Sequence, residues 1–179
     1  WGIKIYILDP DENCPSRPFC TKFFQGDLMD YNTVYNFGKE VDLITIEIEN
    51  INVEAFEELK KENKIVYPQP EILKIIQDKS LQKEFYLNNN IPTTPFLICN
   101  SKEEVKKLIS NGDRLYPFIW KSSKMGYDGY GVKLLENDNS IEDIPDKHCI
   151  LEDKAEIEKE LSVMVVSMPS GEIINYPVV

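Results

Sequence analysis

Residues 41–67, VDLITIEIENINVEAFEELKKENKIVY, contain two apolar runs rich in β-branched residues with an amphipathic segment between them. The runs cover residues 41–46 and 65–67, and short runs of this composition predict β-strands. In residues 53–62, apolar side chains recur at helical spacing opposite a charged face, which predicts an α-helix. This order of strand, helix and strand is typical of a parallel α/β sheet.

The same alternation extends towards the N-terminus. Further strands are predicted at residues 3–8 and 20–24, and a helix is predicted at residues 30–39. The opening sequence WGIKIYILDP is an apolar run that ends in an acidic turn, as the second strand of a βαβ unit does. We therefore expect a Rossmann-like α/β domain over residues 1–77, whose first strand and glycine-rich turn would precede this sequence.

After this domain the pattern changes to that of a mixed α+β domain, which we assign to residues 78–179. Helical turns begin after Pro70 and continue until the segment NNNIPTTPF interrupts them. Ser101 and Glu104 have the spacing of a capping box, which predicts a helix through Ser110. Strands with much antiparallel pairing are predicted at residues 93–99, 118–122, 131–135, 149–152, 161–166 and 172–179, the last two joined by the turn MPSGE.

Composition and charge exclude several classes of protein. The 179 residues, of 20.8 kDa, allow one large domain or two small ones. The content of 42% hydrophobic and 28% charged residues is typical of a soluble globular protein, and no apolar run approaches the roughly 20 residues that a bilayer requires. A net charge of −11 argues against nucleic-acid polymers and anionic membranes as partners, because both attract basic surfaces. We interpret the protein as cytoplasmic.

The cysteines and the single histidine form no recognisable metal or catalytic motif. Cys14, Cys20, Cys99 and Cys149 are scattered without a CxxC pair, and His148 has only one of them beside it. Structural zinc sites use more ligands at characteristic spacing, and a histidine-based triad needs a matching nucleophile. Buried thiols in a reducing compartment are the favoured interpretation, so we assign no metal ligand in this sequence.

The segment FIWKSSKMGYDGYG, residues 118–131, combines a predicted strand with a glycine-rich loop. The strand carries Lys121, and the glycines after it let the backbone approach a polyphosphate with N–H groups pointing at its oxygen atoms. The tip of a β-hairpin is an equally good interpretation of the loop taken alone. The spacing differs from GxxxxGK[ST], and a strand follows the loop, so neither the P-loop nor the dinucleotide fingerprint applies.

Several segments taken together are more specific than this loop. They are, in order, LDPDENCPS, LITIEIENIN, YPQPEILKIIQDKSLQKEF, KMGYDGYGV, ILEDKAEIEKELSV and SGEIINYPVV. They closely resemble the 5-(carboxyamino)imidazole ribonucleotide synthases, which are ATP-grasp enzymes. The resemblance covers essentially the whole sequence, as the first half of such an enzyme. It implies a pre-ATP-grasp domain over residues 1–77, without its first strand, and the first part of an ATP-grasp domain over residues 78–179.

The resemblance implies a carbon–nitrogen ligase of purine biosynthesis, commonly a homodimer. In such enzymes ATP phosphorylates bicarbonate to carboxyphosphate, and the exocyclic amine of aminoimidazole ribonucleotide then takes up the carboxyl group. ADP and phosphate are released, and Mg²⁺ bridges the ATP phosphates. The Mg²⁺ ligands are expected beyond residue 179, so these 179 residues alone are expected to be inactive. The alternatives are another ATP-grasp ligase, such as formate-dependent glycinamide ribonucleotide transformylase, or a nucleotide-binding module without catalysis.

Two lysines match the cationic ATP contacts of the family. They are Lys79 in QDKSLQK and Lys121 in WKSS, and ammonium groups are suitable point-charge partners for phosphate oxygens. Outside its motif, Lys79 would be interpreted as a solvated helix residue.

The acidic segment LEDKAEIEKE matches the part of the family that runs along adenosine. The resemblance places Glu160 on the ribose hydroxyls, where a carboxylate can accept from both. Without the resemblance we would interpret the segment as an exposed, charged linker. The residues assigned to the adenine edge are Glu152, Asp153, Lys154 and Ala155.

Glu47 follows a predicted parallel strand, at the edge of the sheet where open α/β folds bind ligands. The resemblance places aminoimidazole ribonucleotide there, with Tyr127 and Asp128 from the loop over the same cavity. The loop departs from the family at Tyr130, where a basic residue is usual, and Lys124 is a candidate substitute for it. The loop residues assigned to nucleotide binding are Gly126, Tyr127, Asp128, Gly129, Tyr130 and Gly131.

Overall fold

The computed structural model describes residues 2–113, 115–124 and 131–179, and its first part contains the predicted alternation of strands and helices. Two pairs of strands are parallel, β1 with β2 and β3 with β4. The elements in this part are β1 (Tyr6–Asp9), the 3₁₀ helix η1 (Arg17–Phe19), β2 (Lys22–Gln25), α1 (Tyr31–Lys39), β3 (Leu43–Ile44), α2 (Val53–Lys61), β4 (Ile65–Val66) and α3 (Pro70–Ile76). The predicted parallel α/β character of this first part is therefore confirmed.

Side chains before the helices explain where α1 and α2 begin. The Asp30 carboxylate accepts a hydrogen bond of 2.7 Å from the N–H of Thr33, in the first turn of α1. The Asn52 side chain accepts one of 2.9 Å from the N–H of Ala55, in the first turn of α2. Such caps satisfy backbone donors that have no partner within the helix.

The first hydrophobic core lies between these helices and the short strands. Phe56 and Leu59 on α2 are completely buried, and α1 lies directly against α2. The helices approach closely because Gly38 of α1, which has no side chain, faces Leu59. The buried members of this core are Val34, Ile44, Ile51, Val53, Ala55, Phe56, Leu59, Val66 and Leu73.

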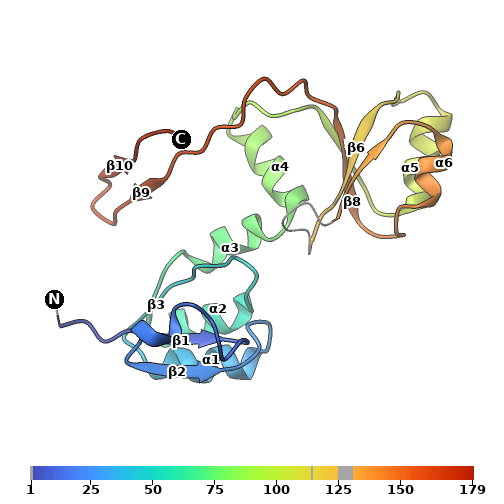
Figure 1. Ribbon diagram of the computed structural model, residues 1–179. Coiled ribbons are helices and arrows are strands. Elements are labelled where there is room, and N and C mark those ends of the chain that lie inside the picture. Colours follow the sequence, from blue (N-terminus) through green and yellow to red (C-terminus); the bar gives the residue numbers. More distant parts are fainter. Residues whose placement is uncertain (1, 114, 125–130) are drawn as a thin grey trace.

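The second part is built on an antiparallel sheet with the strand order β5-β8-β6-β7. Helices α5 and α6 lie on one side of this sheet and α4 lies on the other (Figure 1). The elements are α4 (Lys79–Asn88), β5 (Phe96–Cys99), α5 (Lys102–Ser110), β6 (Phe118–Ser122), β7 (Val132–Leu135), α6 (Asp138–Glu142) and β8 (Cys149–Asp153). The predicted mixed α+β character is confirmed.

Alternation along β6 and β8 gives the sheet two different faces. Phe118 and Trp120 of β6, with Leu151 of β8, are buried in a second core under α5 and α6. Their sequence neighbours Lys121 and Glu152 therefore point to the opposite face, towards α4. The buried members of the second core are Cys99, Val105, Phe118, Trp120, Leu135, Ile141, Ile144, Cys149 and Leu151.

The last strands form a separate exposed hairpin of β9 (Val165–Ser167) and β10 (Ile173–Asn175), which lies away from the four-stranded sheet (Figure 1). The strands predicted at residues 161–166 and 172–179 are therefore too long. Ser162 and Val179 exchange two backbone hydrogen bonds, but the pairing between them and the hairpin is irregular. Apolar alternation overestimated the strands because these side chains lack a core to pack against among the described residues.

The structure corrects other details of the prediction. Ser101 caps α5 by accepting from the N–H of Glu104, but the Glu104 carboxylate accepts from the N–H of Asn100, so the capping box is incomplete. Helix α6 was not predicted, although Asn137 and Ser140 form a complete capping box at its start. Within the described residues, no helix combines the length and apolar character needed to cross a bilayer.

Candidate functional site

A pocket of about 380 Å³ lies on the α4 side of the four-stranded sheet. Lys79 enters it from the first turn of α4, Lys121 from β6, and Glu152 from the central strand β8. Predicted site residues that are distant in sequence are therefore brought together. The pocket is lined by Lys79, Gln82, Lys83, Tyr86, Thr93, Thr94, Lys121, Ile150, Glu152, Asp153 and Ala155.

Glu152 is the centre of a charged cluster in this pocket. Its side chain is only 7% exposed, and its two carboxylate oxygens contact different lysines. Oε1 lies 2.8 Å from Nζ of Lys83, and Oε2 lies 2.5 Å from Nζ of Lys121. Burial, the largest influence, raises the pKa of Glu152, but the hydrogen bonds from Lys121 and Lys83 together hold it below its usual value. The carboxylate is therefore ionised at neutral pH.

Lys79 connects the pocket to the strand end that precedes the glycine-rich loop. Its backbone N–H donates a hydrogen bond of 2.8 Å to the carbonyl of Ser123. Burial lowers the pKa of the Lys79 ammonium, and the nearby Lys121 charge lowers it further. The pocket thus holds two lysines whose charges repel each other, a local arrangement that favours an anionic ligand.

One backbone donor at the end of β8 is already used within the fold. The N–H of Asp153 donates to the carbonyl of Pro95, just before β5, at 3.0 Å. Lys154 is exposed and does not line the pocket, whereas Ala155 does. Glu160 is exposed in an irregular segment and also lies outside the pocket lining.

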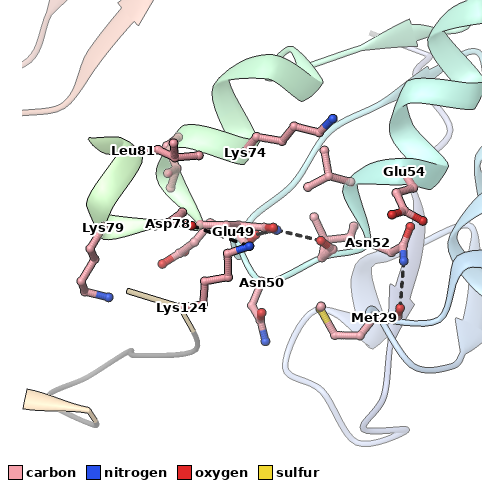
Figure 2. A pocket seen from close by; sticks show the side chains of 14 residues that line it. Met29, Glu49, Asn50, Asn52, Glu54, Lys74, Asp78, Lys79, Leu81 and Lys124 are labelled. Atoms are coloured by element: carbon pink, nitrogen blue, oxygen red, sulfur yellow. Dashed lines mark hydrogen bonds and ion pairs between the residues drawn. The ribbon is translucent and has the colours of Figure 1, made fainter. Parts of the chain in front are cut away.

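Glu47 lies in a different place from the lysine cluster. It is exposed and lines a separate pocket of about 520 Å³, between β1 and the segment that follows β3. Another pocket, of about 500 Å³, brings Glu49 to the N-terminal end of α4, with Asp78, Lys79 and Lys124 (Figure 2). Nζ of Lys124 lies 3.6 Å from Oδ2 of Asp78 in this pocket.

Comparison with known proteins assigns the chain to a family. The ribonucleotide synthetase preATP-grasp domain matches residues 1–77, and the ATP-grasp domain matches residues 84–179, more than half of the chain. The chain belongs to the ATP-grasp family.

Individual ATP-grasp relatives are similar over almost all of this chain. A phosphoribosylaminoimidazole carboxylase from Candida glabrata is 33% identical over 99% of the chain and 32% of its own length. An N5-carboxyaminoimidazole ribonucleotide synthase from Staphylococcus epidermidis is 31% identical over 92% of the chain and 44% of its own length. The chain therefore spans 32% to 44% of the length of these curated relatives.

A solved ATP-grasp structure has the same fold. It is the N5-carboxyaminoimidazole synthase from Aspergillus clavatus, in complex with ADP and 5-aminoimidazole ribonucleotide. It matches with a TM-score of 0.83 and 26% identity, over 99% of this chain and 46% of its own.

Most of the glycine-rich loop lies outside the described residues. The predicted site residues concerned are Gly126, Tyr127, Asp128, Gly129 and Tyr130. Its two ends are described and are held together. The N–H of Ser122 donates to the carbonyl of Gly131 at 2.8 Å, and Gly131 has a positive φ of 74°. Ser122 Oγ donates to the carbonyl of Lys124 at 2.6 Å. The ATP-grasp loop therefore starts and ends beside the pocket that holds Lys121.

Sequence reasoning missed Lys83, the second lysine that contacts Glu152. It lies one helical turn after Lys79 in α4, so helical spacing could have placed both on one face. Mg²⁺ would need a group of oxygen ligands. The described residues contain no cluster of three or more His, Cys, Asp or Glu side chains that could hold a metal.

Proposed function

We propose that the full-length protein binds ATP in the pocket between α4 and the four-stranded sheet. The observation that carries this proposal is the convergence of Lys79 and Lys121 on that pocket in a chain of the ATP-grasp family. Both ammonium groups would contact the polyphosphate, whose charges would relieve the repulsion between them. Lys121 is 29% exposed at its side chain, so a ligand can reach it without unfolding the cluster.

The remaining nucleotide contacts are proposed from the same family. Adenine would lie against the end of β8, at Glu152, Asp153, Lys154 and Ala155. Because the Asp153 N–H already donates to Pro95, the adenine donor would come from a later residue of this run. Glu160 would bind the ribose hydroxyls after its exposed segment moves towards the pocket.

We propose that the reaction is the carboxylation of 5-aminoimidazole ribonucleotide in purine biosynthesis. The support is the similarity to one enzyme named for the product of that reaction and to another with 5-aminoimidazole ribonucleotide bound. Bicarbonate would attack the γ-phosphorus of ATP and give carboxyphosphate and ADP. The exocyclic amine would then attack the carboxyl carbon, with loss of phosphate and a proton. Glu47, Tyr127 and Asp128 are the proposed substrate-facing residues.

Several further properties belong to this proposal. We propose a domain boundary between Gln77 and Asp78, where α3 ends and α4 is capped. Mg²⁺ would assist phosphoryl transfer. We also propose a cytoplasmic homodimer, as is common in such enzymes.

Phosphate release by the purified full-length protein tests the function. With ATP and bicarbonate, release should require 5-aminoimidazole ribonucleotide. Formate with glycinamide ribonucleotide is the matched alternative, and it should give no release above background. Release that is indifferent to 5-aminoimidazole ribonucleotide would contradict the proposed reaction. Nucleotide binding without any release would favour a binding module.

A further inference from the structure

Lys83 is an almost buried lysine that the proposed reaction does not use. Its side chain is 10% exposed, and it projects from α4 towards the sheet. A buried ammonium group is unfavourable unless it is paired and fully hydrogen-bonded, so its surroundings determine why it is tolerated.

All the hydrogen-bonding capacity of Lys83 is already used. Nζ lies 2.8 Å from Glu152 Oε1 and 3.1 Å from Thr94 Oγ1, and it also donates to Thr93 Oγ1. The Phe96 ring centroid is 5.6 Å away, so an aromatic face covers another side of the ammonium. A lysine ammonium has three N–H donors. None remains for a bound nucleotide, and Lys83 therefore acts through its neighbours.

The neighbour that matters is Glu152, because it joins Lys83 to Lys121. The two lysines bind opposite oxygens of one carboxylate, so a single negative charge is shared between two positive charges. Lys83 is the more buried partner, at 10% side-chain exposure against 29% for Lys121. The cluster thus carries one net positive charge, and its exposed end is Lys121.

We propose that Lys83 is a positioning residue that occupies one oxygen of Glu152 and thereby leaves the charge of Lys121 available to the phosphates of ATP. This inference rests on the proposed nucleotide site. Without Lys83, the whole negative charge of Glu152 would act on Lys121. The pair would become neutral, and Glu152, whose Oε2 is already 2.5 Å from Nζ of Lys121, would compete more strongly with the ligand for that ammonium.

The test compares ATP with adenosine, which has no phosphate charge. In the full-length protein, Lys83→Met should weaken ATP binding by at least tenfold in titration calorimetry. Adenosine binding should change by less than threefold, because its contacts do not involve the Lys121 charge. Lys107→Met, at an exposed position on α5, removes one positive charge far from the pocket lining and should change neither affinity.

A second pair of variants separates charge from folding. Lys83→Arg keeps the charge and should retain most of the ATP affinity. Lys83→Met combined with Glu152→Gln removes both partner charges and frees Lys121, so the ratio of ATP affinity to adenosine affinity should recover relative to Lys83→Met alone. Relief of an under-compensated buried charge would restore both affinities together, so recovery of the ATP-to-adenosine ratio separates the charge effect from a change in folding.

The outcomes distinguish a positioning role of Lys83 from a purely structural one. Equal losses of ATP and adenosine binding in Lys83→Met would show a purely structural role and overturn the inference. Unchanged ATP affinity in Lys83→Met would also overturn it, while leaving the nucleotide site intact. If the unmodified protein binds no ATP, the proposed function fails first and the inference fails with it.

Discussion

The contact between Gly38 and Leu59 allows a worked prediction about the core that supports the first domain. A Cβ atom at Gly38 would lie 2.2 Å from Cδ1 and 2.9 Å from Cδ2 of Leu59. Carbon atoms pack at about 3.5–4.0 Å, so Gly38→Ala requires a displacement of more than an ångström in the Leu59 side chain or between α1 and α2. Leu59 is completely buried and has little space to move into.

Two opposing effects set the magnitude for Gly38→Ala. Overpacking of a core lowers the free energy of unfolding by about 1–3 kcal/mol. Replacing glycine by alanine within a helix raises it by roughly 0.5–1 kcal/mol. We therefore expect a net loss of about 1–2 kcal/mol, measured by urea denaturation followed by circular dichroism.

A double-mutant cycle isolates the contact. Leu59→Ala alone should lower the free energy of unfolding by about 2–5 kcal/mol, because it leaves a cavity. In that background the obstructing methyl groups are gone, so Gly38→Ala should be neutral or stabilising. If Gly38→Ala were equally destabilising with and without Leu59, the steric explanation would be wrong.

Other predictions concern charge and thiol access. Lys121→Met should weaken ATP binding about tenfold, or about 1.4 kcal/mol. The attraction between the Lys121 ammonium and a phosphate charge is roughly 4 kcal/mol at 4 Å, and Glu152 partly cancels it. Lys107→Met is the control, and an unchanged ATP affinity in Lys121→Met would refute this role. Because burial and the nearby Lys121 charge lower the pKa of Lys79, bound polyphosphate should raise that pKa. The complex then binds more protons than the free protein, so ATP affinity should fall as pH rises towards 10.5. The proton uptake measured by calorimetry should be small near pH 7 and should grow over the same rise in pH. ATP affinity that stays constant up to pH 10.5 would contradict this argument. Cys20 is the most accessible cysteine and should react with a thiol reagent in the folded protein, whereas mass spectrometry should find the other three modified only after denaturation.

The fold could be predicted from sequence because its signals are local. Helices α1 and α2 begin at capping residues, Asp30 and Asn52, whose partners lie within the first turn of each helix. Their apolar spacing is likewise a feature of neighbouring residues in the sequence. Strand lengths were less predictable, since β3 and β4 have only two paired residues each although their apolar runs are longer. Apolar composition identifies a buried segment, but the number of ladder hydrogen bonds depends on which strands lie beside it.

The site was only partly predictable, because its central contact depends on strand register. Lys121 was identified by its motif, and Glu152 was assigned to the adenine edge. In the structure Lys121 pairs with Ile150 in the β6 and β8 ladder, which places Glu152 two residues further along the same face. A shift of one residue in that register would turn Glu152 into the core under α5 and α6.

Strands β6 and β8 pair in the sheet but are separated in the sequence by a long connection. The chain leaves β6 through the glycine-rich loop, forms β7, and then crosses the sheet through α6, which sequence analysis did not predict. Only after that crossing does β8 place Glu152 opposite α4, where Lys83 can reach it. A lysine on a helix and a glutamate on a distant strand each resemble ordinary surface residues in the sequence. Their burial together is intelligible only as a pair, because neither charge would be stable there alone.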